Sequence, residues 1–228
     1  MVTEKQMNHQ DNDRVLRLDG RQPLSAAWVS AVVEACGRVE TDGRNLVVHV
    51  FGTPDGPWPD DLTVSLVSKW ERALRRLERL PAATIAVAEG DCGGLALDAL
   101  LATDYRIATE ATRLVLPVRD GATWPGMALY RLGRQAAGAS VIRRAALFGT
   151  PVAAAEALAV HLVDEVADDP ARALELAGER LAPVSGSELA IRRQLIFDAS
   201  SIAFEDALGA HLAACDRALR RAAVEVAS

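Results

Sequence analysis

The segment EGDCGGLALDALLATDYRIA, residues 89–108, places three glycines close to a lone acid. Gly90, Gly93 and Gly94 precede a run of helix-forming residues, and Asp98 stands near the start of that run. A glycine-rich turn between a buried strand and a helix leaves backbone N–H groups without partners at the positive end of the helix dipole. Such N–H groups attract negative charge, and a nearby carboxyl group can transfer a proton.

The spacing of these glycines argues against two phosphate-binding motifs. A dinucleotide-binding loop has the pattern G-x-G-x-x-G after the first strand, with an acid about 20 residues further on. The stretch GDCGGLA has another spacing and follows a later strand, and it lacks the G-K-S/T of a P-loop. The remaining chemical interpretation is an oxyanion site, in which amides face a carbonyl oxygen that becomes negative during reaction. The alternative is a simple connection whose glycines only permit positive φ.

The elements that must position these residues alternate between strands and helices. Short apolar runs predict strands at 15–18, 46–52, 84–90, 105–109 and 114–118. Apolar residues at helical spacing predict helices at 24–39, 63–80 and over most of the chain from residue 128 onward. We expect the C-terminal helical part to break near Ser200 or Gly209. This alternation predicts an α/β fold with a parallel sheet that is covered on both faces.

The composition limits the class of protein. The 228 residues are 50% hydrophobic, which is enough for one sizeable core, and the net charge of −6 argues against a nucleic-acid surface. Cys36, Cys92 and Cys215 have neither zinc-type spacing nor an even number for a disulfide framework. We therefore expect no metal site and a cytoplasmic location. No run approaches the ~18–20 apolar residues of a membrane span.

From residue 84 onward the order of motifs resembles that of the crotonase (enoyl-CoA hydratase/isomerase) superfamily. The resemblance is carried by TIAVAEGDCGGLALDALLATDYRIA at 84–108, RLVLPVRDGATWPG at 113–126 and RRAALFGTPVAAAEALAVHLVDEV at 143–166. Each piece is weak alone, and the order and separations of all three make the resemblance specific. It implies a crotonase spiral of ββα units with a helical C-terminal oligomerisation region, and a homotrimer or hexamer.

The resemblance also suggests a division of the chain. Residues 1–13 are polar and are expected to form a disordered tail. Residues 14–170 are expected to form the crotonase-fold core, and residues 171–228 the helical C-terminal region.

The resemblance assigns the parts of an oxyanion hole. Aligned on Asp104, the chain has Gly94 at the first glycine of the family's triplet, while Leu95 and Ala96 replace the other two. The implied oxyanion donor is therefore the backbone amide of Leu95. The family's second donor comes from a loop that corresponds to GPWPDDL at 56–62, where either Asp60 or Asp61 is a candidate and we assign the amide of Asp61.

Asp98 falls on a catalytic acid of the family, where glutamate is usual. The alternative for Asp98 is a solvated or capping acid on the first helical turn. Val118 occupies the position of the hydratases' second glutamate and cannot transfer a proton, unless a shift in register brings in Asp120. Gly93, Gly94 and Val118 are expected to contact substrate. Trp58 and Trp124 are expected to line an aromatic acyl pocket, with simple packing as their alternative.

The implied activity is that of an acyl-CoA hydratase/dehydratase-like lyase whose coenzyme A is part of the substrate, without a separate cofactor. The altered motifs resemble the small hydratase-like members that assist formation of dihydroxyphenylacetyl-CoA, a polyketide-derived aromatic acyl-CoA of antibiotic biosynthesis. A homologous crotonase or a type III polyketide synthase is the implied partner. The alternative is a non-catalytic scaffold that stabilises such a partner. A serine peptidase of the related Clp-type fold is disfavoured, because residues 90–98 contain no serine.

Overall fold

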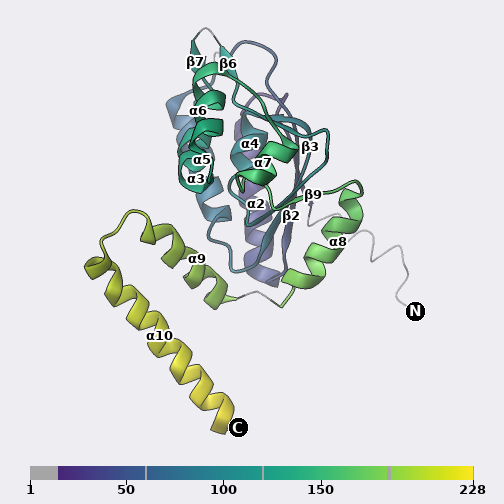
Figure 1. Cartoon of the computed structure of the whole chain (residues 1–228). Coiled ribbons are helices and arrows are strands. Elements are labelled where there is room, and N and C mark those ends of the chain that lie inside the picture. The colour runs from purple at the N-terminus through teal and green to yellow at the C-terminus, as the bar shows by residue number, and fades with distance from the viewer. Residues whose placement is uncertain (1–14, 60, 120, 184–185, 228) are drawn as a thin grey trace.

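A mostly parallel sheet forms the centre of the fold in the computed structural model (Figure 1). The structure describes residues 15–59, 61–119, 121–183 and 186–227, so the tail predicted at 1–13 lies outside it. The central strands lie in the order β1-β2-β3-β4-β9 and are all parallel. Their bounds are β1 Val15–Asp19, β2 Leu46–Gly52, β3 Thr84–Gly93, β4 Tyr105–Ala108 and β9 Glu165–Val166.

Strand β3 changes partners along its length. Its first half pairs with β4, while Asp91–Gly93 pair with β5 (Arg113–Val115), which in turn pairs antiparallel with β8 (Val152–Ala153). Gly90 lies between the two halves with a φ of 62°, a conformation that favours glycine. The strand predicted to end at Gly90 therefore continues to Gly93. The local sequence did not indicate this, because the pairing partner lies about twenty residues later in the chain.

Side chains alternate between the two faces of the sheet, and each face packs against helices. Ala86 and Ala88 of β3 belong to a large apolar cluster on one face, which includes residues of α2, α3 and α4. Ile85 and Val87 belong to a second cluster with α8. The bounds of these helices are α2 Ala26–Asp42, α3 Val64–Leu77, α4 Leu95–Leu100 and α8 Pro170–Leu181. The covered parallel sheet predicted from the sequence is confirmed.

Helix α3 shows why its sequence forms a helix at this place. The Thr63 side chain accepts a hydrogen bond from the Leu66 amide and caps the first turn. Trp70, Leu74 and Leu77 recur at helical spacing and are buried against the sheet side. The helix ends at Leu77, three residues before the predicted end.

The region between β5 and β9 is more divided than its sequence predicted. The strand expected at 114–118 is wrong: β5 ends at Val115 and β6 (Val118–Arg119) begins after Pro117, which has no N–H for a continuous ladder. Strand β6 pairs only with β7 (Ala122–Thr123) in a small separate hairpin. The helices that follow are α5 Ala128–Gln135, α6 Ala139–Phe148 and α7 Ala154–Ala159.

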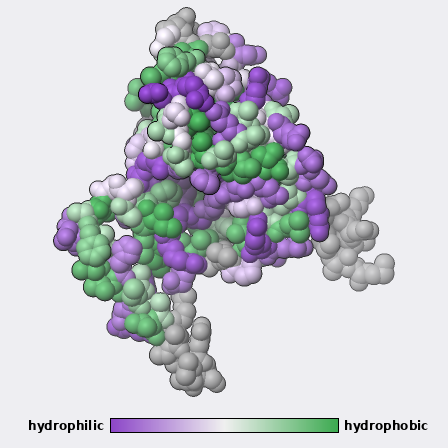
Figure 2. Space-filling model, in the orientation of Figure 1, coloured by the Kyte–Doolittle hydropathy of each residue, from purple (hydrophilic) through white to green (hydrophobic). Residues whose placement is uncertain are grey.

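Two helices end the described chain, α9 (Ser187–Ala199) and α10 (Phe204–Ala227). The break between them follows Ser200, one of the two predicted positions. Arg193 anchors α9 to the core, because its buried side chain donates to both oxygens of Asp104 and to main-chain oxygens near the end of α3. Helix α10 packs on α9 and extends away from the sheet (Figure 1), and Figure 2 shows hydrophobic residues exposed along this helical pair.

Across the part of the chain that the structure describes, no helix combines the length and the apolar character needed to span a bilayer.

Candidate active site

The turn into α4 presents the main-chain amide assigned to the oxyanion hole. Gly94 caps α4 with φ 56° and ψ −131°, a conformation that favours glycine. The first N–H groups of a helix have no acceptor within the helix. Among the described residues, no hydrogen-bond acceptor for the Leu95 N–H is found. The Leu95 side chain is fully buried in the apolar cluster, so the leucine that replaces a family glycine packs in the core.

The space beside this turn is occupied. A Cβ built on Gly94 would lie 2.8 Å from Cγ of Pro54 and 3.7 Å from Cδ2 of Trp124. A Cβ built on Gly93 would lie 2.3 Å from Oγ1 of Thr53. Glycine is thus required at both positions because Thr53, Pro54 and Trp124 pack directly against the main chain. Of these two glycines, the alternative of a connection that only permits positive φ fits Gly94 alone, and close packing is a further reason for glycine at both positions.

The second oxyanion amide was assigned to Asp61, on the loop after β2. Asp61 is exposed, and its assignment as the second donor stays a prediction. Asp60 lies outside the described residues. The residues that flank the turn directly after β2 are Thr53 and Pro54, and proline has no N–H to donate.

Asp98 is fully buried, with a side chain that is 0% exposed. Its Oδ2 accepts hydrogen bonds from Nε1 of Trp124 at 2.6 Å and from Nε1 of Trp70 at 3.2 Å. Its Oδ1 has no hydrogen-bond partner in the described structure. Gly126 packs so closely that a Cβ there would lie 2.1 Å from Oδ2. The solvated-acid alternative for Asp98 is therefore wrong, because the surrounding indoles exclude water from the carboxyl group.

The environment of Asp98 favours its neutral form. Burial is the main cause that raises the pKa of Asp98 to about 7, and the nearby charge of Glu71 raises it further. The hydrogen bond from Trp124, the charge of Arg131 and the hydrogen bond from Trp70 lower it. A carboxyl group with this pKa exists in both protonation states near neutral pH, so it can act as an acid and as a base.

The two tryptophans predicted to line an acyl pocket contact each other. The rings of Trp58 and Trp124 lie edge to face, with centroids 5.5 Å apart and an interplanar angle of 69°. Trp124 is 5% exposed and fills the space between Asp98 and the Gly94 turn. In this conformation the two rings pack together, which was the alternative interpretation of these residues.

Val118 lies on the β6–β7 hairpin and is 40% exposed. A Cβ built on Gly149 would lie 3.9 Å from its Cγ2, which places Val118 near the end of α6. Asp120 lies outside the described residues. Among the described residues, Asp98 is the acid that lies in the first turn of α4 itself.

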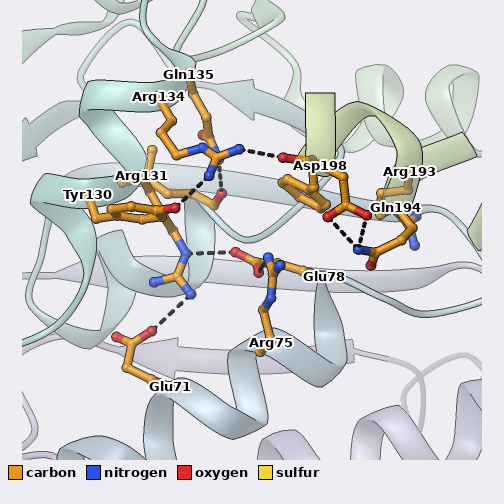
Figure 3. Close-up of polar contacts among 12 residues, drawn as sticks. Glu71, Arg75, Glu78, Tyr130, Arg131, Arg134, Gln135, Arg193, Gln194 and Asp198 are labelled. Atoms are coloured by element: carbon orange, nitrogen blue, oxygen red, sulfur yellow. Dashed lines mark hydrogen bonds and ion pairs between the residues drawn. The ribbon is translucent and has the colours of Figure 1, made fainter. Parts of the chain in front are cut away.

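A network of buried charges lies next to this site, between α3 and α5 (Figure 3). Arg131 of α5 forms ion pairs with Glu71 at 2.9 Å and with Glu78 at 2.8 Å. Arg75 also pairs with Glu78, and the Met127 amide donates to Glu71. Burial lowers the pKa of Arg131, but the ion pairs with Glu78 and Glu71 outweigh it and raise that pKa overall. Glu71 and Arg131 therefore act electrostatically both within this network and on Asp98.

A cavity of about 1050 Å³ lies between α3, α5 and α9 and shares this charged wall. Its lining includes Arg72, Glu71, Arg131, Met127 and Phe197. The residues assigned to the oxyanion site from the sequence do not line it. Asp98 and Trp124 are also absent from its lining, whereas Glu71 and Arg131 line the cavity and act electrostatically on Asp98.

Metal chemistry is not indicated by the side chains. Within the described residues no group of His, Cys, Asp and Glu is arranged to hold a metal ion. Burial raises the pKa of the Cys92 thiol to about 12, so this cysteine is a poor nucleophile and serves as buried packing.

The sequence reasoning missed Trp70, Gly126, Glu71 and Arg131. Trp70 lies at helical spacing with the apolar residues of α3, and the signal that could have found it is that the N–H of a buried tryptophan needs an acceptor nearby. Glu71 follows Trp70 on α3, and its side chain is only 17% exposed. No local pattern revealed its pairing with Arg131, because that residue belongs to a different helix.

Comparisons with known proteins identify the family of the chain. The sequence model of the enoyl-CoA hydratase/isomerase family matches residues 62–201. A relative from Amycolatopsis orientalis, named an enoyl-CoA-hydratase, is 57% identical over 93% of this chain and 99% of its own length. The chain therefore belongs to the enoyl-CoA hydratase/isomerase family.

Solved structures show the same fold. An enoyl-CoA hydratase/isomerase family protein from Silicibacter pomeroyi has a TM-score of 0.74 at 23% identity, over 91% of this chain and 96% of that protein. An enoyl-CoA hydratase from Mycobacterium smegmatis has a TM-score of 0.74 at 18% identity, over 92% and 88%. The predicted α/β crotonase-like fold is confirmed.

Proposed function

We propose that the protein is a hydratase- or dehydratase-type lyase that acts on an acyl-CoA thioester. The observation that carries the proposal is a free main-chain amide close in sequence to a buried acid. The Leu95 N–H has no acceptor in the described fold. Asp98 lies three residues later, and its Oδ1 has no hydrogen-bond partner among the described residues. The pKa of about 7 makes Asp98 competent in both protonation states. Coenzyme A enters as part of the substrate, and no separate cofactor is required.

One carboxyl group is sufficient for this reaction. In the dehydration direction, the Asp98 carboxylate takes the proton from the carbon next to the thioester, and negative charge develops on the thioester oxygen. The Leu95 amide donates a hydrogen bond to that oxygen, a type of contact that contributes several kcal/mol to transition-state stabilisation. Asp98 then returns the proton to the departing hydroxyl group, so water leaves and the carboxylate is regenerated.

Substrate access requires a movement of Trp124. Its indole lies against both Asp98 and Gly94, so a thioester reaches Oδ1 and the Leu95 amide only when the ring shifts away from Gly94 while its Nε1 stays on Oδ2 of Asp98. Trp124 directly follows the β6–β7 hairpin, and these two strands pair only with each other in the described sheet. The segment that carries Trp124 is therefore held less firmly than the central strands.

For the substrate we propose an aromatic acyl-CoA of polyketide origin, of the dihydroxyphenylacetyl-CoA type, with a related crotonase or a polyketide synthase as functional partner. Two neighbouring indoles, Trp58 and Trp124, support an aromatic acyl group, because displaced indole rings offer faces and edges for stacking. We further propose a homotrimer or hexamer in the cytoplasm. The exposed side chains of Phe204, Leu212 and Leu219 on α10 support assembly, because they remain unburied in one chain.

The direct test is Asp98→Asn in the full chain, assayed for interconversion of 3-hydroxyacyl-CoA and enoyl-CoA with aliphatic and aromatic acyl groups. Loss of general acid–base catalysis is expected to lower kcat/KM by about 10²–10⁴-fold. Glu110→Gln, at an exposed position, is the matched control and is expected to leave kcat/KM unchanged. Equal activity of Asp98→Asn and the wild type would remove the proposed role of this acid.

One observation favours a second candidate function, a non-catalytic scaffold that stabilises a homologous enzyme or a synthase. The complete enclosure of Asp98 and the filled space at Gly94 are what a site without substrate would show. Calorimetric titration with acetyl-CoA and dihydroxyphenylacetyl-CoA separates the two functions. Binding of either thioester supports the enzyme, whereas a folded protein that binds neither supports the scaffold.

A further inference from the structure

We propose that Trp70 and Trp124 are positioning residues that bind one oxygen of Asp98 and thereby reserve the other oxygen, Oδ1, for proton transfer. The catalytic meaning of this arrangement rests on the proposed function. The arrangement itself is a property of the folded chain and can be measured without substrate.

Both indoles donate to the same oxygen. Trp70 comes from α3 and Trp124 from the segment after β7, yet both Nε1 atoms lie within hydrogen-bond distance of Oδ2, at 3.2 and 2.6 Å. Gly126 closes the remaining side of this oxygen, since even a methyl group there would meet it at 2.1 Å. Oδ2 is therefore fully surrounded, whereas Oδ1 is buried without a partner among the described residues.

The chemistry of indole fixes where the proton lies. An indole N–H only donates and has no lone pair with which to accept a hydrogen bond. A proton on Oδ2 would have to face two donors that cannot accept it. The neutral form of Asp98 therefore carries its proton on Oδ1, and the ionised form keeps Oδ1 as its free basic atom.

The two charged groups that face Asp98 have opposite signs, so the indole hydrogen bonds have a large influence on its titration. Glu71 of α3 and Arg131 of α5 face the carboxyl group with opposite signs, and they pair with each other at 2.9 Å. Their effects on Asp98 therefore partly cancel. What remains is burial, which favours the neutral acid, opposed by two N–H groups that favour the carboxylate. Removal of an indole N–H is thus expected to shift the titration of Asp98 upward.

The first test uses the wild-type chain and its four tryptophans. In a ¹⁵N-resolved NMR titration, the indole N–H signals of Trp70 and Trp124 are expected to move with one shared midpoint, near pH 7. The Trp28 signal is the internal control, because among the described residues only Trp70 and Trp124 donate an indole N–H to Asp98, and the Trp28 ring packs on the apolar core. The shared transition is expected to vanish in Asp98→Asn. Indole signals of Trp70 and Trp124 that do not follow a common titration would overturn the proposal.

The second test measures Asp98 directly, by the ¹³C signal of its carboxyl carbon. Hydrogen bonds to charged groups contribute about 1.5–3 kcal/mol, so Trp124→Phe is expected to raise the midpoint by about one to two pH units. Trp70→Phe is expected to raise it less, because its hydrogen bond is longer. Trp28→Phe is the matched control and is expected to leave it unchanged. An unchanged midpoint in folded Trp124→Phe would contradict the assignment.

The readouts separate this inference from the proposed function. If Asp98 titrates as described and the wild-type chain has no activity on any acyl-CoA, the lyase proposal fails and the positioning by the indoles stands. If the chain is active and the acidic limb of its kcat profile moves upward in Trp124→Phe together with the NMR midpoint, both are supported. Activity with an unmoved pH profile and an unmoved midpoint would overturn the positioning role alone.

Discussion

The Asp98 site and the charge network between α3 and α5 bury acidic side chains by different means. In the network, Glu71 and Glu78 share the guanidinium of Arg131, a full positive charge. At Asp98 the direct donors are two uncharged indoles. The first arrangement balances charge with charge, and the second offers only dipoles.

The two arrangements have different roles: the charge network holds two helices together, whereas Asp98 can exchange a proton. A guanidinium that is paired with two carboxylates holds its own charge and theirs, so the network fixes α3 against α5 (Figure 3). Two indole N–H groups compensate burial only in part, and the pKa of Asp98 rises to about 7. The incompletely compensated acid is the one that can exchange a proton under neutral conditions.

The largest expected effect on stability comes from removal of the cation in the charge network between α3 and α5. Arg131→Met leaves Glu71 and Glu78 buried without their shared cation, and removal of one partner of a buried pair costs about 3–5 kcal/mol of unfolding free energy. Urea denaturation at neutral pH measures it. A loss below about 1 kcal/mol would show that these carboxylates are as well solvated as surface acids.

The second prediction concerns how the titration of Asp98 makes the stability of the protein depend on pH. The pKa of Asp98 is raised from 3.8 to about 7 in the folded chain, so its contribution is fully present below about pH 4 and is lost as the pH rises through about 7. At 1.36 kcal/mol per unit, wild-type stability relative to Asp98→Asn is expected to fall by about 3 kcal/mol between pH 5 and pH 8. Urea unfolding of both proteins at the two pH values measures this difference. A constant difference would mean that Asp98 titrates alike in both states.

The third prediction tests how tightly Oδ2 of Asp98 is enclosed. Gly126→Ala places a methyl group 2.1 Å from this oxygen, and overpacking of this kind costs about 1–3 kcal/mol. Gly133→Ala is the matched control: a Cβ at that position in α5 meets nothing within 4 Å, and alanine favours a helix by about 0.5–1 kcal/mol. Thermal unfolding of the two variants should therefore shift in opposite directions. Equal shifts would contradict the close contact at Asp98.

The smallest effect is expected at an exposed ion pair. Nε of Arg113 lies 2.6 Å from Oδ1 of Asp91, and the two side chains are 55% and 33% exposed. Solvent therefore screens their attraction. Arg113→Gln is expected to change the free energy of unfolding by less than about 1 kcal/mol. The comparison with Arg131→Met then measures how much burial contributes to an arginine–carboxylate pair in this protein.

Parts of the fold could be predicted because their signals are local. The apolar run of β2 matches its observed bounds, and the apolar stripe of α3 marks its buried face. The strand β3 was predicted too short and the segment at 114–118 was predicted too continuous, because both depend on pairing between distant residues and on Pro117. The α/β class followed from the alternation of strands and helices, which tolerates such errors at the boundaries.

The sequence predicted which residues stand in the short helix of the candidate site but not the residues that surround them. Leu95 and Asp98 lie within one helix, so their spacing alone places them at the same helix end. Their surroundings come from other elements: Trp70 is 28 residues before Asp98, and Trp124 is 26 residues after it. No pattern in the sequence states that these two indoles meet at one carboxyl oxygen.

The sequence by itself determined the alternating α/β architecture and the short helix that carries an amide and an acid, because periodicity, glycine positions and spacing act over a few residues. Only the tertiary structure decided that the acid is enclosed, that uncharged donors hold one of its oxygens, and that the space beside the amide is filled by Pro54 and Trp124. The physical reason is that the protonation of a carboxyl group depends on burial and on the donors around it, and both are set by segments that meet only after folding.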